Sequence, residues 1–354
     1  MGTIAVAWWN LENLFDTDDD PISQDFEFTK ANGWTEDVYA AKRANLAAVL
    51  NELHGGNGSE LLGVAEVEGD DVFAQLLADT GNPHLKVVTD PSPPTDLRAI
   101  DVSIAYDDRK LRVVDQTSHI VHLRYPTRDI FEVTFEVVET GDPLVVIASH
   151  WPSRRQGKEH SEPSRMTVAE NIAFLVRDHV RFQSPEYLDR KAAGDLTAVQ
   201  AKFDTPVLIM GDFNDEPSDA SVVGHLQASS ELDRVVGPTN QITKFETEVA
   251  TYRGDDTWLY NACWKFLAPE NLGTFFIEST ASGEHFANRY QVLDNLVASR
   301  GLLRPGGVTL DPGSVDIYRE KSVATVPSCR PRPFNKKTKK GTSDHLPVIA
   351  TLTY

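Results

Sequence analysis

Short apolar runs alternate with longer amphipathic stretches along the chain. Over residues 36–53, apolar side chains recur at helical spacing, and the glycines at positions 55, 56 and 58 predict the end of that helix. Residues 130–138 instead alternate between apolar and polar positions, as a half-buried strand does. The same criteria predict further strands at residues 62–66, 85–89, 102–106, 111–114, 144–149, 207–212, 292–299 and 345–352. They predict helices at 71–79, 167–182 and 218–228, a polar helix or an excursion of the chain at 192–201, and a loop at 91–95.

Several of the apolar runs carry acid, amide or imidazole groups at one end. Buried strands that deliver polar groups to one rim are how a rigid scaffold assembles an active site. Carboxylate and amide oxygens are the ligands that a hard divalent cation prefers. The polar groups at these ends are those of Asn10, Glu12, Asn13, Glu66, His150, Asp212, Asn214, Asp215, Asp344 and His345.

Alternation of strand-like and helical segments predicts a layered α/β or α+β fold. No Pro- or Ser-rich linker divides the chain, so we expect residues 1–354 to form a single catalytic domain. Segments 153–165, 250–290 and 320–342 are expected to surround the site and to select the substrate. They lie between or beside the predicted strands that carry its polar groups.

Composition places the chain among globular proteins, with 40% hydrophobic and 25% charged residues over 354 positions. No apolar run reaches the roughly 18 residues that span a bilayer, so we expect no stable membrane association. The first residues lack a signal-peptide pattern, which predicts a cytoplasmic protein, or a secreted one if a signal was removed. Cys263 and Cys329 show no CxxC spacing and indicate no cysteine-rich zinc site. We expect a monomer.

The net charge of −19 disfavours a protein that grips duplex DNA along its backbone. Positive charge is nevertheless concentrated in two runs, each next to a segment with candidate site residues. These runs are either solvated loops or a local funnel that attracts anionic substrates. The first run contains Arg154, Arg155, Lys158 and Arg165, and the second contains Lys336, Lys337, Lys339 and Lys340.

Six motifs occur in order along the chain, namely Asn10-Leu-Glu12-Asn13, Glu66, Ser149-His150-Trp151-Pro152, Gly211-Asp212-Phe213-Asn214, Leu293-Asp294 and Ser343-Asp344-His345. Together they resemble those of the endonuclease/exonuclease/phosphatase superfamily, which includes pancreatic-type deoxyribonucleases, abasic-site endonucleases, neutral sphingomyelinases and inositol polyphosphate phosphatases. The resemblance runs from residue 4 to residue 352. It implies a four-layer sandwich, in which two packed, mostly antiparallel β-sheets are flanked by helices. It also implies a phosphoester hydrolase that uses Mg²⁺ or Mn²⁺.

Four residues are candidates to hold the metal. Glu66 ends an apolar run, where a carboxylate has no packing role, so it is the first candidate ligand. The alternative is a rim carboxylate paired to a lysine. The amide of Asn10 could bind the ion or a phosphate oxygen, or could form a turn at the strand end. The resemblance implies that Glu12 is a secondary ligand and that Asp344 also reaches the metal.

Five residues are candidates for the chemistry itself. If the strand persists, Asp212 and Asn214 point to the same side while Phe213 points into the core. The resemblance implies that Asp212 orients or deprotonates the attacking water or assists the leaving group, and that Asn214 holds the phosphate. It pairs Asp294 with His345, and an imidazole needs such a carboxylate to fix its tautomer. His150 corresponds to a phosphate-contacting histidine of the deoxyribonuclease and sphingomyelinase branches.

The sequence departs from the abasic-site branch after Glu66. That branch has a lysine there, whereas Val67-Glu68-Gly69-Asp70-Asp71 forms an acidic rim that disfavours duplex DNA. Arg98 could contact phosphate or form a structural ion pair. We expect a phosphodiesterase or nuclease-like enzyme, with nucleic acid as one candidate substrate. The alternatives are hydrolysis of a small-molecule or lipid head-group phosphoester, and a binding module that has lost turnover.

Overall fold

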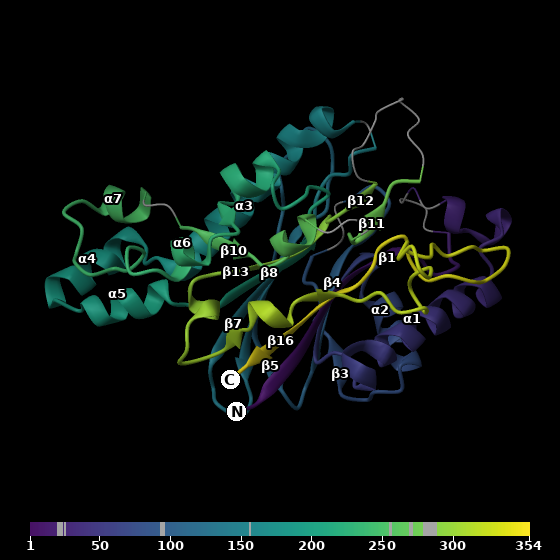
Figure 1. The fold of residues 1–354 in the computed structure, drawn as a ribbon, viewed down its shortest axis with the longest axis horizontal. Coiled ribbons are helices and arrows are strands. Elements are labelled where there is room, and N and C mark those ends of the chain that lie inside the picture. Colours follow the sequence, from purple (N-terminus) through teal and green to yellow (C-terminus); the bar gives the residue numbers. More distant parts are fainter. Residues whose placement is uncertain are drawn as a thin grey trace.

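Two seven-stranded β-sheets pack against each other, and helices cover their outer faces (Figure 1). This computed structural model describes residues 1–19, 24, 26–92, 96–155, 157–254, 257–268, 272–278 and 289–354. Residues 93–95 of the predicted loop, and parts of segments 153–165 and 250–290, lie outside the described residues. The predicted α/β sandwich with mostly antiparallel sheets is confirmed, because most strand pairs in both sheets are antiparallel.

The first sheet is built around the N-terminal and C-terminal strands. β1 (Thr3–Leu14) pairs antiparallel with β16 (Val348–Thr353) and parallel with β2 (Leu61–Val67). The remaining strands are β4 (Asp101–Asp107), β3 (Leu85–Val87), β14 (Thr309–Leu310) and β15 (Asp316–Ile317). Both termini lie at one edge of the sandwich (Figure 1), so Asn10 and the residues before β16 lie toward the opposite edge.

The second sheet has the order β5-β6-β7-β8-β13-β10-β9. Its centre is the parallel pair of β7 (Pro143–His150) and β8 (Val207–Asp212), and β8 continues the sheet through antiparallel β13 (Asp294–Ala298). The register sets His150 beside Asp212 and Asp212 beside Asp294. The other strands are β5 (Leu111–His119), β6 (Ile130–Val137), β10 (Leu259–Asn261) and β9 (Ala228–Ser229), and β11 (Phe275–Phe276) forms a separate pair with β12 (Tyr290–Gln291).

Two glycines allow close approach in the core, one between the facing sheets and one between neighbouring strands of the second sheet. A Cβ atom on Gly63 of β2 would lie 2.6 Å from the Met210 sulfur of the facing sheet and 2.8 Å from the Trp8 ring. A Cβ atom on Gly211 would lie 2.3 Å from the carbonyl oxygen of Ser149. Because real Cβ contacts are longer, only glycine fits there, and β8 can approach β7 next to the site residues.

The helices follow the predicted pattern with three differences. α1 (Glu36–Gly56) and α2 (Asp70–Asp79) agree with the predictions. α3 (Lys158–Val180) begins nine residues before the predicted 167, so part of the first basic run is helical. The predicted helix at 192–201 is divided at Gly194. The predicted helix at 218–228 is shorter than expected and is a π-helix (Ser221–His225), which leads into β9. The remaining short elements are α4 (Ser184–Ala193), α5 (Leu196–Phe203), α6 (Leu232–Val236), α7 (Val249–Gly254), η1 (Phe26–Phe28), η2 (Lys30–Asn32), η4 (Trp264–Leu267), η5 (Gly301–Leu303) and η6 (Pro312–Ser314).

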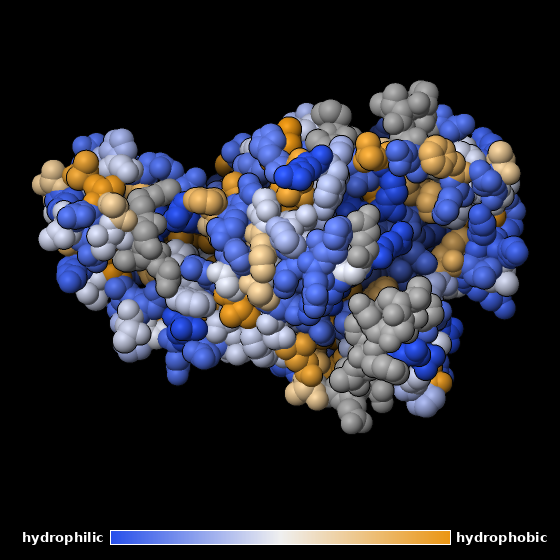
Figure 2. Space-filling model, turned by 90° about the horizontal axis from the view of Figure 1, so that it is seen from above, coloured by the Kyte–Doolittle hydropathy of each residue, from blue (hydrophilic) through white to orange (hydrophobic). Residues whose placement is uncertain are grey.

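α4, α5 and α7 form a narrower lobe at one end of the molecule (Figures 1 and 2). The face seen in Figure 2 is predominantly hydrophilic, with hydrophobic residues scattered over it. In the described part of the chain, no helix combines the length and the apolar composition that a membrane crossing requires.

Candidate active site

Two neighbouring strands are irregular at the level of the predicted metal ligands. The β1–β2 register shifts between Asn10 and Leu14, and the β2–β4 register shifts between Ala65 and Val67. Glu12, Asn13 and Glu66 have left-handed backbone conformations, with φ of 55°, 58° and 61°. Left-handed non-glycine residues are uncommon, and bulges near active sites redirect side chains. Simple strand alternation therefore does not set the direction of Glu12 or Glu66.

The carboxylates of Glu12, Glu66 and Asp344 lie near one another around the buried Lys42. The pKa of Glu12 is raised to about 7, mainly by burial. The ammonium group of Lys42 lowers this pKa, whereas the charges of Asp344 and Glu66 raise it. Burial also raises the pKa of Asp344, with a further contribution from Glu66. Like charges brought together away from water require a compensating cation, and Lys42 supplies only one positive charge.

Lys42 and a backbone amide hold the end of β1 in place. The Lys42 ammonium group donates to the carbonyl oxygens of Glu12 and Asn13, the latter at 3.5 Å. The backbone N–H of Phe334 donates to Oε2 of Glu12 at 2.7 Å. Asn10 Oδ1 accepts the Glu12 N–H at 2.9 Å, which fixes the turn between these two residues. Glu12 is thus held by Asn10 of its own strand and by two distant segments, at Lys42 and Phe334.

His345 and Asp294 form the predicted pair. His345 Nδ1 lies 2.7 Å from Asp294 Oδ2, and both residues are buried. Asp294 Oδ1 accepts a hydrogen bond from Nε1 of Trp8 at 2.9 Å, so both carboxylate oxygens have a partner. Burial opposes a charge on His345, but the carboxylates of Asp294 and Asp212 outweigh it and raise the pKa of the imidazole well above its usual range. His345 is therefore an imidazolium at neutral pH.

Asp212 connects the two sheets. Its Oδ2 accepts a hydrogen bond from Asn10 Nδ2 at 3.0 Å and lies 3.5 Å from His150 Nε2 and 3.7 Å from His345 Nε2. Burial raises the pKa of Asp212 to about 7, although His345 opposes this. A carboxyl group whose pKa lies near neutrality can both accept and return a proton.

Asn214 lies beyond the end of β8. It has a left-handed φ of 49°, so it leaves the strand instead of continuing its alternation. Its backbone N–H donates to Asp212 Oδ1 at 2.9 Å, and its Nδ2 donates to the carbonyl oxygen of Trp151 at 3.0 Å. Phe213 is buried as predicted and stacks on Trp151 with ring centroids 4.2 Å apart. Asn214 is thus close to Asp212 through a turn that this stack supports.

His150 lies between carboxylates and arginines. Its Nε2 is 3.9 Å from Glu66 Oε1 as well as 3.5 Å from Asp212. Burial lowers the pKa of His150 well below its usual range, and the nearby Arg128 and Arg98 lower it further. His150 is therefore neutral, unlike His345.

Arg98 and Arg128 supply positive charge beside His150. Arg98 donates to Asn13 Oδ1 at 2.9 Å, and its Nε lies 3.8 Å from Asp96 Oδ1. Arg128 Nε lies 3.3 Å from Asp96 Oδ2. Arg98 thus forms an ion pair with Asp96, which was one of the two interpretations that the sequence left open. Asp96 thus holds both guanidinium groups beside His150, and the charge of Glu66 also acts on Arg98.

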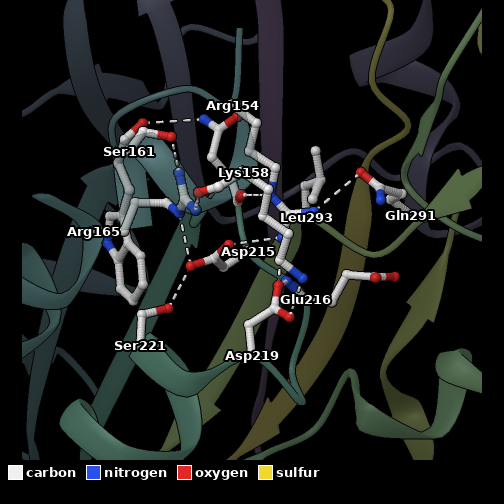
Figure 3. A network of polar contacts seen from close by, with 12 residues as sticks. Arg154, Lys158, Ser161, Arg165, Asp215, Glu216, Asp219, Ser221, Gln291 and Leu293 are labelled. Atoms are coloured by element: carbon white, nitrogen blue, oxygen red, sulfur yellow. Dashed lines mark hydrogen bonds and ion pairs between the residues drawn. The ribbon is translucent and has the colours of Figure 1, made fainter. Parts of the chain in front are cut away.

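Three of the four residues of the first basic run are paired with carboxylates (Figure 3). Arg165 is fully buried, and its Nε lies 2.7 Å from Asp215 Oδ2. Arg154 lies 2.7 Å from Asp215 Oδ1, and both Arg154 and Lys158 contact Asp219. This run is therefore a structural network that holds the loop after β8 against α3, and most of its charge is unavailable to attract anions.

Several residues that support the site had no predicted role, and one of them, Ser343, was recognised only as part of the last motif. Thr274 Oγ1 accepts the N–H groups of Leu293 and Asp294 at 3.1 Å each. Ser343 Oγ donates to the Asn10 carbonyl at 2.6 Å and accepts the His345 N–H at 3.0 Å. Trp8, Lys42 and Arg128 are the other residues that sequence reasoning missed. Pattern analysis assigns isolated residues of these types to the core or the surface.

A sequence profile described as the Endonuclease/Exonuclease/phosphatase family matches residues 5–269. A comparison with curated proteins found no match.

Solved structures share the fold over the whole chain. An endonuclease/exonuclease/phosphatase from Bacteroides vulgatus has a TM-score of 0.51 at 14% identity, covering 100% of this chain and 99% of that chain. D. rerio TDP2 humanized by 14 mutations has a TM-score of 0.54 at 10% identity, covering 99% of each chain. D. rerio TDP2 complexed with single strand DNA product has a TM-score of 0.52 at 10% identity, covering 100% of each chain.

At these identities the structural likeness establishes the fold alone, whereas the profile match covers most of the chain. The family and the fold are those of phosphoester hydrolases, which generally use divalent metals. The chain belongs to the endonuclease/exonuclease/phosphatase family.

Proposed function

We propose that residues 1–354 form one catalytic domain that hydrolyses a phosphodiester in a Mg²⁺- or Mn²⁺-dependent, nuclease-like reaction. The observation that carries the proposal is one buried polar group, Asp212 Oδ2, within 3.0–3.7 Å of Asn10, His150 and His345. Groups that manage protons thereby lie next to the carboxylates that could hold a metal. Such clusters of perturbed ionisable groups are typical of catalytic sites.

The donor set fits a hard divalent cation. Glu66, Glu12 and Asp344 offer carboxylate oxygens, and Asn10 offers an amide oxygen with a lone pair beyond the one that accepts the Glu12 N–H. A divalent ion held there would neutralise phosphate charge and polarise the phosphorus centre. Asp212, Asp294 and His345 also place three ligand atoms within 4.8 Å. Asp294 is already hydrogen-bonded to His345 and Trp8, so we assign that group to proton handling.

The remaining residues have distinct roles in this proposal. Asp212 accepts a proton from the attacking water, because its pKa of about 7 suits a general base at neutral pH. The imidazolium of His345, oriented by Asp294, stabilises negative charge on the phosphate. Neutral His150 donates a hydrogen bond to a phosphate oxygen. Asn214 Nδ2 has a second N–H besides the one bound to Trp151, and this second N–H binds the phosphate.

A second candidate is hydrolysis of a small-molecule or lipid head-group phosphoester. The net charge of −19 and the inward pairing of Arg154 and Arg165 both favour a small substrate over a duplex. A similar fold accommodates the single strand DNA product in D. rerio TDP2, which supports the nuclease-like candidate. Both candidates use the same site residues and differ in what surrounds the phosphate.

The test measures hydrolysis of bis-(p-nitrophenyl) phosphate, p-nitrophenyl phosphate and supercoiled plasmid with Mg²⁺, Mn²⁺ or a chelator. We expect diester hydrolysis that requires metal and falls at least about 10³-fold in Asp212→Asn and Glu66→Gln. Asp316→Asn, an exposed carboxylate on β15, is the matched control and should retain activity. Calorimetry should show metal binding lost in Glu66→Gln and retained in Asp212→Asn. Metal-independent hydrolysis would overturn the proposal, and hydrolysis of the monoester alone would select the second candidate.

A further inference from the structure

A cavity of about 400 Å³ adjoins the carboxylate cluster. It reaches Glu12 and Lys42 at one side and the segment 334–337 at the other. That segment lies beside α1 and the short helices before it (Figure 1), where Lys336 donates to the Asn32 carbonyl at 2.9 Å and Lys339 contacts Asp37. The volume lies within the range of pockets that enclose a small organic ligand.

One wall of the cavity is a row of aromatic rings. Phe28 and Trp34 meet edge-to-face with centroids 5.2 Å apart, and Trp34 and Phe334 do so at 6.1 Å. Phe28 is backed by Phe15, which stacks on it at 4.3 Å. Three separate segments thus build one rigid aromatic wall, and Phe28 and Phe334 remain only half-buried. A preorganised aromatic surface binds a planar ring at low entropic cost.

Cationic groups lie at the same cavity. Three lysines and two glutamates line it. Lys42 faces the carboxylate cluster, so Lys336 and Lys337 are the cationic groups on the side of the cavity next to Phe334. Lys337 is exposed, and among the described residues no carboxylate lies within ion-pair distance of its ammonium group. An aromatic wall beside a free lysine suits a ligand that combines a planar ring with an anionic group.

The wall is directly connected to the reaction centre. The backbone N–H of Phe334 donates to Oε2 of Glu12 at 2.7 Å, and the Lys42 ammonium group lies 5.3 Å from the centroid of the Phe334 ring. A group bound in the cavity would therefore be adjacent to a phosphate at the carboxylate cluster.

We propose that this cavity is a nucleobase subsite, so that the substrate is a phosphodiester of a nucleotide with its base against Phe28 and Phe334 and a further phosphate near Lys337. The inference rests on the proposed hydrolysis for its placement next to the scissile phosphate. It adds the substrate class, which the arrangement of catalytic groups does not specify.

The first test is binding in the presence of a chelator, with quenching of Trp34 fluorescence as the readout and a Trp34→Phe variant to identify that signal. Adenosine 5′-monophosphate is compared with adenosine, inorganic phosphate and phenyl phosphate. We expect the nucleotide to bind more tightly than either of its parts and more tightly than phenyl phosphate. Equal affinity for phosphate alone, or for phenyl phosphate, would overturn the nucleobase assignment.

The second test uses Phe334→Leu, which keeps apolar volume and the backbone N–H but removes the ring. Loss of a base-stacking contact of about 1.4 kcal/mol lowers affinity about tenfold. The ratio of kcat/KM for thymidine 5′-(p-nitrophenyl phosphate) over methyl p-nitrophenyl phosphate should fall by the same factor. Phe174→Leu, an exposed aromatic residue on α3, is the matched control and should leave the ratio unchanged.

The outcomes separate this inference from the proposed function. Nucleotide binding that depends on Phe334, without any hydrolysis, would support the subsite and contradict the hydrolysis. Hydrolysis with an unchanged ratio in Phe334→Leu would support the enzyme and overturn the subsite. Lys337→Gln provides a second variant at an exposed position, should Phe334→Leu fail to fold. It should weaken binding of the nucleotide and leave binding of adenosine unchanged.

Discussion

Replacement of Asp294 by asparagine keeps the shape of the side chain and changes one hydrogen-bonding atom. In the wild-type protein, Oδ1 accepts from Trp8 Nε1 at 2.9 Å and Oδ2 faces His345 Nδ1 at 2.7 Å. The indole N–H of Trp8 can only donate, so the atom that faces it must be an acceptor whatever the protonation state of His345. The variant has one carbonyl oxygen for two donors.

Two arrangements of the variant are available, and both carry a cost. If the amide oxygen remains with Trp8, the amide NH₂ faces His345 Nδ1, which must then become an acceptor with its proton on Nε2. If the oxygen faces His345, the NH₂ opposes the Trp8 N–H, and a buried donor stays unsatisfied at a cost of about 1–3 kcal/mol. The first arrangement is cheaper, so Asp294→Asn should hold His345 in the neutral tautomer protonated at Nε2.

The expected effect is large on turnover and small on stability. In the variant, His345 keeps its Nε2 proton but loses its positive charge, and loss of one electrostatic stabiliser of the transition state costs about 10²–10³ in kcat, which is the loss we expect here. KM should change little, because the orientation of the ring is preserved. Nitrogen-15 NMR of the imidazole should report an Nε2-protonated neutral ring in the variant and an imidazolium in the wild-type protein.

A second substitution tests the cause of the effect. Trp8→Phe removes the indole donor, so that in the double variant Trp8→Phe/Asp294→Asn the amide oxygen can turn toward His345. Activity of the double variant should then exceed that of Asp294→Asn, although Trp8→Phe alone lowers stability. The explanation is refuted if Asp294→Asn retains activity within about threefold of the wild-type protein. It is also refuted if the double variant is no more active than Asp294→Asn, because Trp8 and His345 would then not compete for the amide oxygen.

Three further predictions concern stability, each measured by urea unfolding. Gly211→Ala should cost about 3 kcal/mol, because its Cβ would lie 2.3 Å from the Ser149 carbonyl oxygen; an unchanged midpoint would show that β7 and β8 separate easily. Asp215→Ala should cost about 3–5 kcal/mol, since it leaves Arg165 buried without its carboxylate; a cost below 1 kcal/mol would contradict this. Burial raises the pKa of Glu132, but two histidine side chains lower it to about 2 from an ordinary 4.5, so its contribution to stability is complete above pH 4.5 and is lost as the pH falls toward 2. Glu132→Gln should remove that pH dependence, and equal slopes for both proteins between pH 5 and 3 would refute it.

The sequence predicted the sheets and most of the residues at their shared edge. Glu66, His150 and Asp212 end apolar runs. The parallel pair β7 and β8 brings His150 to Asp212, and Glu66 comes from β2 of the facing sheet. The pairing of Asp294 with His345 came from resemblance to a family, because 51 residues separate them and no periodicity connects them. Strand alternation does not explain why Asn214 lies close to Asp212, because Asn214 leaves the strand in a left-handed turn.

The residues that support the site were beyond prediction, because each acts through a contact between distant segments. Lys42 reads as an ordinary polar position of an amphipathic helix, yet it is buried and bonds to carbonyls about 30 residues earlier. Trp8 reads as core, but its indole contacts a residue 286 positions away. Bulges at Glu12 and Glu66 leave no pattern in the sequence, since a left-handed φ at glutamate is set by its surroundings.

Runs of like charge in the sequence are a poor guide to the electrostatics of the folded site. The first basic run follows His150 in the sequence, but Asp215 and Asp219 neutralise most of its charge. The run therefore has a structural role. Arg98 and Arg128 are isolated in the sequence, and they share one carboxylate beside His150. Because Coulomb energy depends on distance and burial, unshared charge near the phosphate matters more than the net charge of −19. An acidic chain can therefore bind an anionic substrate locally, provided that the substrate is small enough to avoid the rest of its surface.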